Sequence, residues 1–179
     1  TYGMHGAVAS ELDQAGYDSI ELPVNAVTFK LFVRFFHEDP WQISEQFRHK
    51  ITRTKKSIVI MDCLDLLGEP ESRSMIRMYY DMIARYTGSS RFFSLANTRN
   101  ELDRSFPWLV PMAREMGQEF MPAICYYPSP RTTDEYYADL TRRLMAYKPD
   151  ALMLKDAGGL LSLDRIRTLL PAIQKEARG

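Results

Sequence analysis

Short apolar runs alternate with longer segments of helical periodicity along this chain, and this alternation constrains the fold more than any other feature. Five runs have the length and composition of strands, at 19–22, 57–61, 92–95, 120–126 and 150–154. Their starts fall about 30 to 40 residues apart, which is the length of a strand with its crossover helix. The sequence therefore predicts an α/β fold built on a parallel sheet.

The segments between the runs predict helices. Apolar residues recur at helical spacing within 71–86, where we interpret the methionines and tyrosines as core residues rather than a cofactor site. Further helices are expected at 8–14, 43–50, 102–116, 133–147 and 162–173. The glycines that follow two of these segments, Gly16 and Gly117, are typical of helix ends.

Composition narrows the class of protein. The 179 residues include 23 basic and 23 acidic side chains, so net charge gives no reason to expect binding to nucleic acid or to an anionic membrane. No apolar run approaches the roughly 18 residues of a membrane span, and no signal peptide is recognised. Cys63 and Cys125 lack the spacing of a metal site, which favours two buried thiols in a reducing cytoplasm.

Lys155 and Asp156 directly follow the run 150–154. The sequence therefore places them at the carboxyl end of a strand, where barrel enzymes keep their chemistry. A glycine pair then allows the chain to turn before Ser162 begins a helix. Because a buried ammonium needs a partner, an ordinary salt bridge explains Lys155 as well as a catalytic role does. On spacing alone, both interpretations stay open.

Four segments match, in the same order, motifs of one enzyme family. Residues 154–161 resemble a Lys-Asp-Met-Ala-Gly-Leu-Leu motif, and 15–21 resemble Ala-Gly-Phe-x-Ser-Leu-Glu. Residues 34–41 end in Glu-Asp-Pro-Trp, the most specific match, and 123–130 are similar to Ile-Cys-Tyr-Thr-x-Ser-Pro. The chain thus resembles the carboxyltransferase domain of pyruvate carboxylase, the oxaloacetate decarboxylase alpha subunit and the transcarboxylase central subunit. These belong to the HMG-CoA-lyase-like superfamily of metal-dependent TIM barrels.

The resemblance implies a (β/α)8 TIM barrel, of which this chain supplies about five strand–helix units, since a complete barrel needs about 250 residues. The family's first-strand motif, Asp-x-x-x-Arg-Asp-Gly-x-Gln, and its later His-x-His pair are both absent from the sequence. We therefore expect residues 1–179 to form a single carboxyltransferase-like barrel domain that lacks its first strand and its last strands. A shorter relative that closes its sheet differently is the alternative.

The resemblance also implies a reaction. The family transfers a carboxyl group between carboxybiotin and a small 2-oxo acid, of the pyruvate or oxaloacetate type, through a metal-stabilised enolate. By the matched motif, Lys155 is expected to be carboxylated on its amine and to bind a divalent metal, Zn, Mn or Co. Asp156 is expected to orient Lys155 or the backbone around it. The carboxybiotin is expected to arrive on a biotin carboxyl carrier domain or subunit.

Other candidate site residues follow earlier predicted strands. Glu21, near the end of 19–22, is a weaker metal ligand candidate, with a hydrogen bond to a loop as its other interpretation. Asn25 and Thr28 are expected to line the pocket, although the family has Gly-Gly-Ala-Thr there. Asp62 stands where the family has an arginine that grips the substrate carboxylate, and an aspartate repels such an anion.

These departures keep two other functions open. One is a metal-dependent carbon–carbon lyase or aldolase of the same superfamily that works without biotin. The other is a degenerate, non-catalytic barrel subunit, which the Asp62 replacement and Ser94, in place of a family aspartate, support. Under every interpretation we expect a cytoplasmic protein without membrane insertion that forms homo-oligomers, because an incomplete barrel exposes unpaired strand edges.

Overall fold

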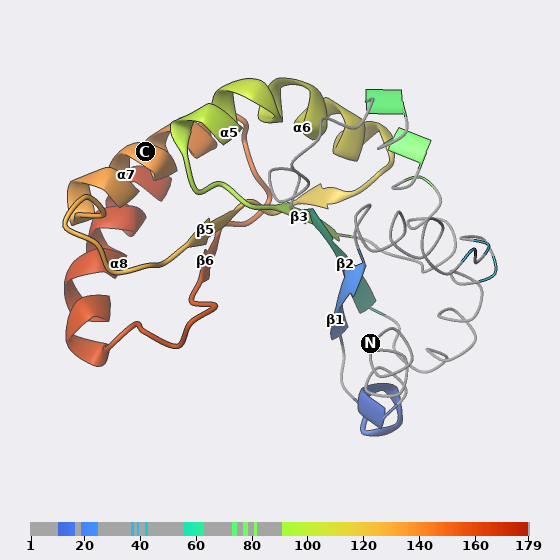
Figure 1. The fold of residues 1–179 in the computed structure, drawn as a ribbon, viewed down its shortest axis with the longest axis horizontal. Coiled ribbons are helices and arrows are strands. Elements are labelled where there is room, and N and C mark those ends of the chain that lie inside the picture. Colours follow the sequence, from blue (N-terminus) through green and yellow to red (C-terminus); the bar gives the residue numbers. More distant parts are fainter. Residues whose placement is uncertain are drawn as a thin grey trace. The chain divides into compact units, whose positions relative to one another are not determined.

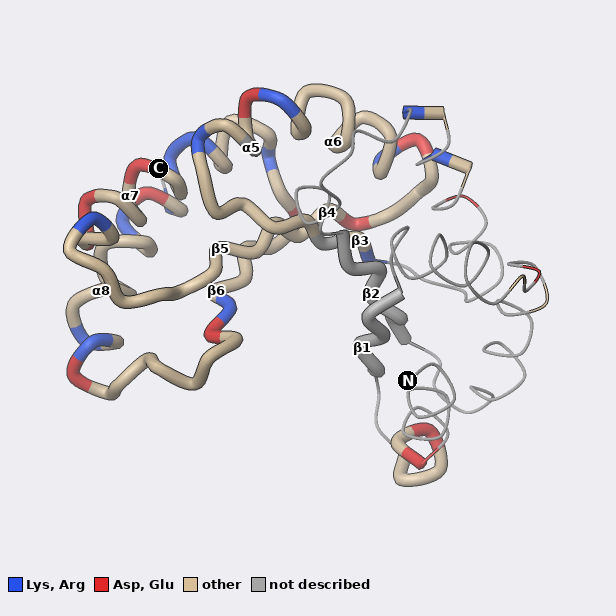
Figure 2. The backbone as a smooth tube through the Cα atoms, viewed as in Figure 1, with Lys and Arg blue, Asp and Glu red and all other residues tan. Residues whose placement is uncertain are grey.

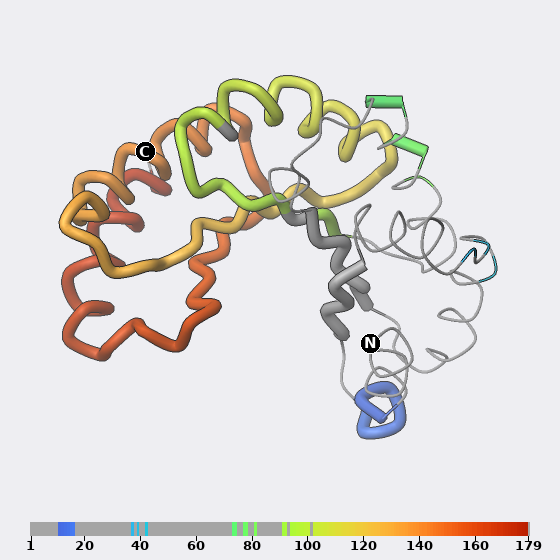
Figure 3. Tube along the Cα trace, in the orientation of Figure 1, coloured from blue at the N-terminus to red at the C-terminus, as the bar shows by residue number. Residues whose placement is uncertain are grey.

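The structure, a computed structural model, describes residues 11–16, 19–24, 37, 39, 42, 56–62, 73–74, 77–78, 81 and 91–178. The last of these stretches is continuous (Figure 3) and holds most of the elements labelled in Figure 1. The chain divides into two compact units. Unit 1 comprises Thr1–Phe93 and Met112–Glu119, and unit 2 comprises Ser94–Pro111 and Phe120–Gly179.

Parallel pairing of β1 (Ser19–Val24) with β2 (Lys56–Asp62) organises the described part of unit 1. Glu21 stands opposite Val59, and irregularities interrupt the register on both sides of this region. The sheet continues in the order β1-β2-β3-β4, with β3 at Arg91–Ser94 and β4 at Glu119–Phe120. An ion pair of 2.6 Å between Arg91 Nε and Glu119 Oε2 joins the starts of β3 and β4.

Unit 2 contains a second parallel pair, β5 (Ala123–Cys125) with β6 (Met153–Lys155). Two amphipathic helices, α7 (Asp134–Met145) and α8 (Leu163–Ala177), follow these strands and pack against each other. The hydroxyl of Thr133 caps α7 by accepting from Tyr136 N, and the hydroxyl of Ser162 caps α8 by accepting from Arg165 N. Each strand is thus followed by a helix, as in a β/α unit.

Aromatic and aliphatic side chains form the core of unit 2. Phe106 and Phe120 are fully buried and meet edge to face, with ring centroids 5.4 Å apart. The ring of Tyr147 meets Phe106 on another side, at 5.6 Å. Three leucines and one isoleucine of α7 and α8 are also buried: Leu140, Leu144, Leu169 and Ile173.

The structure confirms the predicted α/β fold with parallel strands but differs in three boundaries. The predicted strand 120–126 is two strands, because Pro122 lacks the N–H that a continuous ladder requires. The predicted helix 102–116 is likewise two helices, α5 (Arg99–Arg104) and α6 (Phe106–Glu115). The carbonyl of Ser105 accepts from Leu109 N at 3.0 Å and starts a new helix at the break.

The third difference concerns β1, which continues through Pro23 to Val24 although Pro23 was expected to close it. Of the predicted helix 71–86, the five residues that the structure describes are helical. The predicted helix 43–50 lies outside the described residues. None of the described helices combines the length and apolar character of a transmembrane segment.

Phe106→Ala tests the aromatic core. Removing the ring leaves a cavity between Phe120 and Tyr147, and we expect the free energy of unfolding to fall by about 3–5 kcal/mol. Urea denaturation followed by circular dichroism measures this change. Lys175→Ala, at an exposed position of α8, is the control and should change stability by less than about 0.5 kcal/mol. Equal stabilities for the two variants would contradict this account of the core.

Candidate active site at the strand ends of unit 2

The carboxyl ends of β5 and β6 lie side by side (Figure 1). Cys125 and Lys155, the last residues of the two strands, are register partners, and Tyr126 N donates to Lys155 O at 2.8 Å. Lys155 therefore ends a parallel strand, as the sequence predicted. Both side chains are half-buried, so each combines contact with the protein and access to solvent.

A third segment joins these two strand ends. Just after β3, Leu95 forms a parallel bridge with Ala123, and Ala96 N donates to Ala123 O at 2.9 Å. The next residue, Asn97, accepts a hydrogen bond from Cys125 N through its side-chain Oδ1, at 3.3 Å. Three chain segments thus bring Asn97, Cys125 and Lys155 to one edge of unit 2. We call these residues, together with Asp156, the strand-end cluster.

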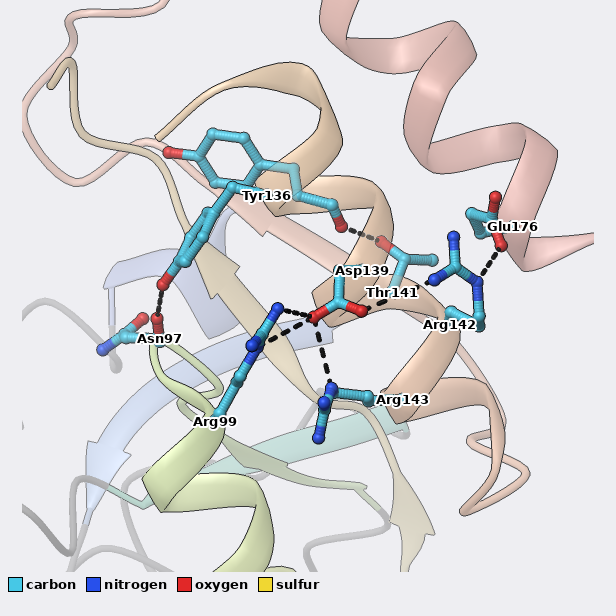
Figure 4. A network of polar contacts seen from close by, with 9 residues as sticks. Asn97, Arg99, Tyr136, Asp139, Thr141, Arg142, Arg143 and Glu176 are labelled. Atoms are coloured by element: carbon cyan, nitrogen blue, oxygen red, sulfur yellow. Dashed lines mark hydrogen bonds and ion pairs between the residues drawn. The ribbon is translucent and has the colours of Figure 1, made fainter. Parts of the chain in front are cut away.

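Asn97 is held from two sides. While its side chain accepts from β5, its main-chain carbonyl accepts from the hydroxyl of Tyr136 at 2.5 Å (Figure 4). Tyr136 lies in the first turn of α7, which fixes this helix to the loop after β3. Asn97 was not among the predicted site residues. A signal was present, because residues 93–97 resemble a further motif of that family, Phe-Asp-x-x-Asn, and Asn97 keeps its last residue.

Asp156 organises the loop that follows Lys155. Its two carboxylate oxygens accept from separate main-chain amides, Oδ1 from Leu160 N at 3.0 Å and Oδ2 from Leu161 N at 2.8 Å. These two hydrogen bonds, Leu160 first, lower the pKa of Asp156 below 3.8. Gly159 adopts φ 62° in this loop and donates its N–H to Asp156 O at 3.3 Å. The Asp156 carboxylate therefore closes a tight loop between β6 and α8.

The segment after β5 is also fixed by side chains. The hydroxyl of the fully buried Tyr137 bonds both main-chain groups of Tyr127: it accepts from the N–H at 3.2 Å and donates to the carbonyl at 3.3 Å. The ring of Tyr126 stacks on Tyr137, with centroids 6.1 Å apart. Thr132 Oγ1 donates to Tyr127 O at 2.8 Å. The chain beside the strand-end cluster is thus tied to α7.

Charged side chains connect the helices behind the cluster. Asp139 of α7 pairs with Arg99 at 2.7 Å and with Arg143 at 3.2 Å, and Arg142 pairs with Glu176 of α8 at 2.8 Å (Figure 4). Although burial opposes it, the hydrogen bond and charge of Arg99 lower the pKa of Asp139. Both signs of charge occur along α7 and α8 (Figure 2). These partly exposed pairs contribute little stability individually, and they align α5, α7 and α8.

The other predicted site residues belong to unit 1 or lie outside the described residues. Asp62 is the last residue of β2, at the strand end where the sequence placed it. Glu21 lies in β1 opposite Val59, and the strand continues beyond it to Val24. Asn25 and Thr28 are outside the described residues. Glu21 and Asp62 thus fall in unit 1, whereas Lys155 and Asp156 fall in unit 2.

The described residues do not assemble a metal site by themselves. Nowhere among them do three His, Cys, Asp or Glu side chains gather closely enough to hold a metal ion. In unit 2, Asp156 directs both carboxylate oxygens to main-chain amides. This part of the chain therefore offers one of the predicted ligands, Lys155, and no complete ligand set.

We expect the loop held by Asp156 to depend on pH. Because the pKa of Asp156 is lowered in the folded chain, its stabilising effect is complete above about pH 3.8 and is lost as pH falls through the lower folded value. The amide proton shifts of Leu160 and Leu161, followed by NMR, should titrate with a midpoint below pH 3.8. This titration should vanish in Asp156→Asn, and its persistence there would assign it to another group.

Asn97→Ala tests the link between the loop after β3 and β5. The substitution removes the acceptor for Cys125 N, and we expect it to lower the free energy of unfolding by about 1 kcal/mol. Asn97→Asp keeps a side-chain oxygen at the same place and should retain most of this stability. Urea denaturation of both variants measures the difference, and an Asn97→Ala protein as stable as the parent would show that the hydrogen bond is unimportant.

Comparisons with known proteins identify relatives of this chain. It is 29% identical over 175 residues to a pyruvate carboxylase subunit of Methanothermobacter thermautotrophicus, covering 94% of this chain and 29% of that protein. It is also 29% identical over 177 residues to the methylmalonyl-CoA carboxyltransferase 5S subunit of Propionibacterium freudenreichii, covering 96% of this chain and 33% of that one. No profile of a known protein family matches the chain.

Solved structures give the same result for the fold. The carboxyl transferase domain of Rhizobium etli pyruvate carboxylase matches with a TM-score of 0.69 at 19% identity, covering 88% of this chain and 27% of that one. The chain therefore spans about a third or less of each of these three proteins. The comparisons confirm that it resembles the carboxyltransferase domains of the pyruvate carboxylase and transcarboxylase family and has part of their TIM-barrel fold.

Proposed function

We propose that residues 1–179 form part of a biotin-dependent carboxyltransferase or decarboxylase that acts on a small 2-oxo acid. The observation that carries the proposal is the position of Lys155. It occupies the lysine position of the family motif, and it ends a parallel strand whose neighbour ends at Cys125. The carboxyl ends of parallel strands are where barrel enzymes place their reacting groups. The similarity to a pyruvate carboxylase subunit supports the reaction class.

Lys155 is proposed to act as a carboxylated lysine. A carbamate on Nζ exchanges the positive charge of the ammonium for a negative one, which turns the side chain into an oxygen ligand for a divalent metal. Zn, Mn and Co are the candidates, and Glu21 of unit 1 is a further proposed ligand. When bound, such a metal would act as a Lewis acid toward the substrate carbonyl and favour its enolate form.

Around Lys155, the neighbouring residues are proposed to fix the strand end. Asp156 engages two main-chain amides of the following loop, so we assign it a positioning role rather than proton transfer. Asn97 ties the adjacent strand to the loop after β3. These hydrogen bonds restrict the backbone of the loop after Lys155 and of the strand beside it. A restricted backbone reduces the ordering cost of bringing reactants together.

The residues proposed to contact the substrate differ from the family motifs more than any other part of the proposed site does. Asp62, Asn25 and Thr28 are proposed to contact the substrate. An aspartate at position 62 repels a carboxylate, so a substrate that carries an amine or hydroxyl group near this position is the alternative to pyruvate. The proposed partner is a biotin carboxyl carrier domain or subunit, which delivers carboxybiotin. We further propose a homo-oligomer in the cytoplasm.

The same departure supports a second candidate, a metal-dependent carbon–carbon lyase or aldolase that does not use biotin. A third candidate, a non-catalytic barrel subunit, is supported by the buried Ser94, where the family has an aspartate. Avidin separates the first two candidates because it sequesters biotin. Carboxyl transfer should stop when avidin is added, whereas a lyase should continue.

Two substitutions at Lys155 test the proposal and separate it from an ordinary salt bridge. Neither alanine nor arginine can carry the carbamate, so both Lys155→Ala and Lys155→Arg should reduce carboxyl transfer by at least about 10²-fold. Arginine keeps the positive charge, and a structural salt bridge would therefore survive in Lys155→Arg. Retained activity in that variant would count against the carbamate.

The measurement uses the purified protein together with its biotin carrier. Lys175→Ala, an exposed lysine on α8, is the matched control and should transfer carboxyl groups at the parental rate. Mass spectrometry of the parent should show one added carboxyl group on Lys155, and metal analysis should find a divalent ion that both Lys155 variants have lost. An unmodified Lys155 in an active, metal-free parent would overturn the proposal.

A further inference from the structure

Tyr127 presents an aromatic side chain to solvent beside the candidate active site. It follows Cys125, the last residue of β5, by two positions, and it is 40% exposed. Threonine holds this place in the family's Ile-Cys-Tyr-Thr-x-Ser-Pro motif. The chain thus has a large aromatic ring where the motif has a small polar side chain, and this exchange alters what the strand end can contact.

The ring of Tyr127 is carried on a fixed main chain. The hydroxyl of the buried Tyr137 accepts from Tyr127 N at 3.2 Å and donates to Tyr127 O at 3.3 Å, and Thr132 Oγ1 donates to the same carbonyl at 2.8 Å. All three hydrogen bonds go to main-chain atoms, so position 127 can be substituted without removing them. A fixed backbone also lowers the entropy that a side chain loses when it contacts a ligand.

Tyr127 and Lys155 lie on the same face of the β5–β6 pair. Tyr126 N still donates to Lys155 O, and the ring of Tyr126 stacks on Tyr137 of α7, which directs this ring toward the helices. Side chains alternate along a paired chain, so Cys125 and Tyr127 point to the opposite face. Cys125 and Lys155 are register partners, and partners in parallel strands share a face.

The spacing of Tyr127 and Lys155 suits one small ligand. Neighbouring strands lie about 4.8 Å apart and two residues rise by about 6.6 Å, which puts the Cβ atoms of Tyr127 and Lys155 roughly 8 Å apart. These two atoms therefore do not touch each other. A small acid between the two side chains can contact both at once.

The loop after β6 shows the reverse exchange. The family's Lys-Asp-Met-Ala-Gly-Leu-Leu motif has methionine and alanine where this chain has Ala157 and Gly158. Ala157 and Tyr127 each stand two residues beyond the end of their strand, so the chain has lost bulk in one loop and gained it in the other. Leu160, 56% exposed, folds back over Gly158, with Cγ and Cδ1 3.2 Å from the position that a Cβ at residue 158 would take. Adjacent loops thus expose two large apolar side chains, Tyr127 and Leu160.

Replacement of the lost bulk does not by itself explain Tyr127. A ring that only filled the space of the family's methionine would be covered by its neighbours, as Tyr126 is at 8% exposed. Tyr127, at 40% exposed, keeps a large part of its surface in water. The ring is therefore available for contact with a ligand.

We propose that Tyr127 is a specificity-determining residue of this site, and that its ring packs against a planar apolar substituent of the substrate. Aromatic rings gain free energy by stacking on, or meeting edge to face, another aromatic group. The methyl group of pyruvate would cover little of the Tyr127 ring, whereas an aryl substituent would cover most of it. The inference rests on the proposed function for the 2-oxo acid and adds the chemical class of its substituent.

Ligand binding tests the inference without requiring turnover. Phenylpyruvate and pyruvate are the two probes, and isothermal titration calorimetry of the purified protein gives the Kd of each. The parent should bind phenylpyruvate at least about threefold more tightly than pyruvate. Tyr127→Thr, which restores the residue of the family motif, should weaken phenylpyruvate binding by about three- to tenfold and pyruvate binding by less than about twofold. Tyr127→Phe keeps the ring and should keep the preference.

Leu170→Thr is the matched control, because Leu170 is 38% exposed and lies on α8 away from the strand ends. This variant should bind both probes as the parent does. NMR of the parent needs no substitution, and it should show intermolecular NOEs between the ring protons of phenylpyruvate and those of Tyr127. Absent NOEs, equal Kd values for the two acids in the parent, or an unchanged preference in Tyr127→Thr would each overturn the inference.

Failure of this inference is distinct from failure of the proposed reaction. Phenylpyruvate that binds with the expected preference but receives no carboxyl group would contradict the reaction and support the role of Tyr127. Carboxyl transfer to pyruvate, in a parent that binds the two acids equally, would support the reaction and overturn the role of Tyr127.

Discussion

The parallel pairing of β5 with β6 is the interaction on which unit 2 depends. Each strand contributes three residues, so the pair has few hydrogen bonds of its own and is sustained by what surrounds it. The paired packing of α7 and α8 follows from it, because helices after parallel strands return along the same face. The placement of Lys155 next to Cys125 follows as well. Without this register, the candidate site would not exist.

Much of this arrangement could be predicted from residue patterns. The capping residues Thr133 and Ser162 mark the starts of α7 and α8 within one residue of the expected positions. Lys155 at the end of an apolar run was expected to end a strand, and it does. These features are local, since a cap or a strand end is encoded by residues that are neighbours in the sequence.

The remaining features depend on contacts between distant residues. Tyr136 and Asn97 are 39 residues apart, and no periodicity relates the hydroxyl of one to the carbonyl of the other. Spacing alone also could not show that the carboxylate of Asp156 turns toward the two leucine amides. The break at Pro122 is different, because the missing N–H of proline was visible in the sequence. The prediction of a single strand at 120–126 followed the apolar residues and neglected Pro122, and it was wrong for that reason.

The loop closed by Asp156 has a consequence for how ligands would bind. Its order comes from hydrogen bonds within the chain, with a carboxylate that keeps its charge down to acidic pH. The backbone beside Lys155 is therefore ordered before any ligand arrives, and association need not spend binding free energy on ordering that segment. A ligand at this strand end would meet a preorganised support, so differences in affinity among ligands would reflect their own contacts rather than the folding of the loop.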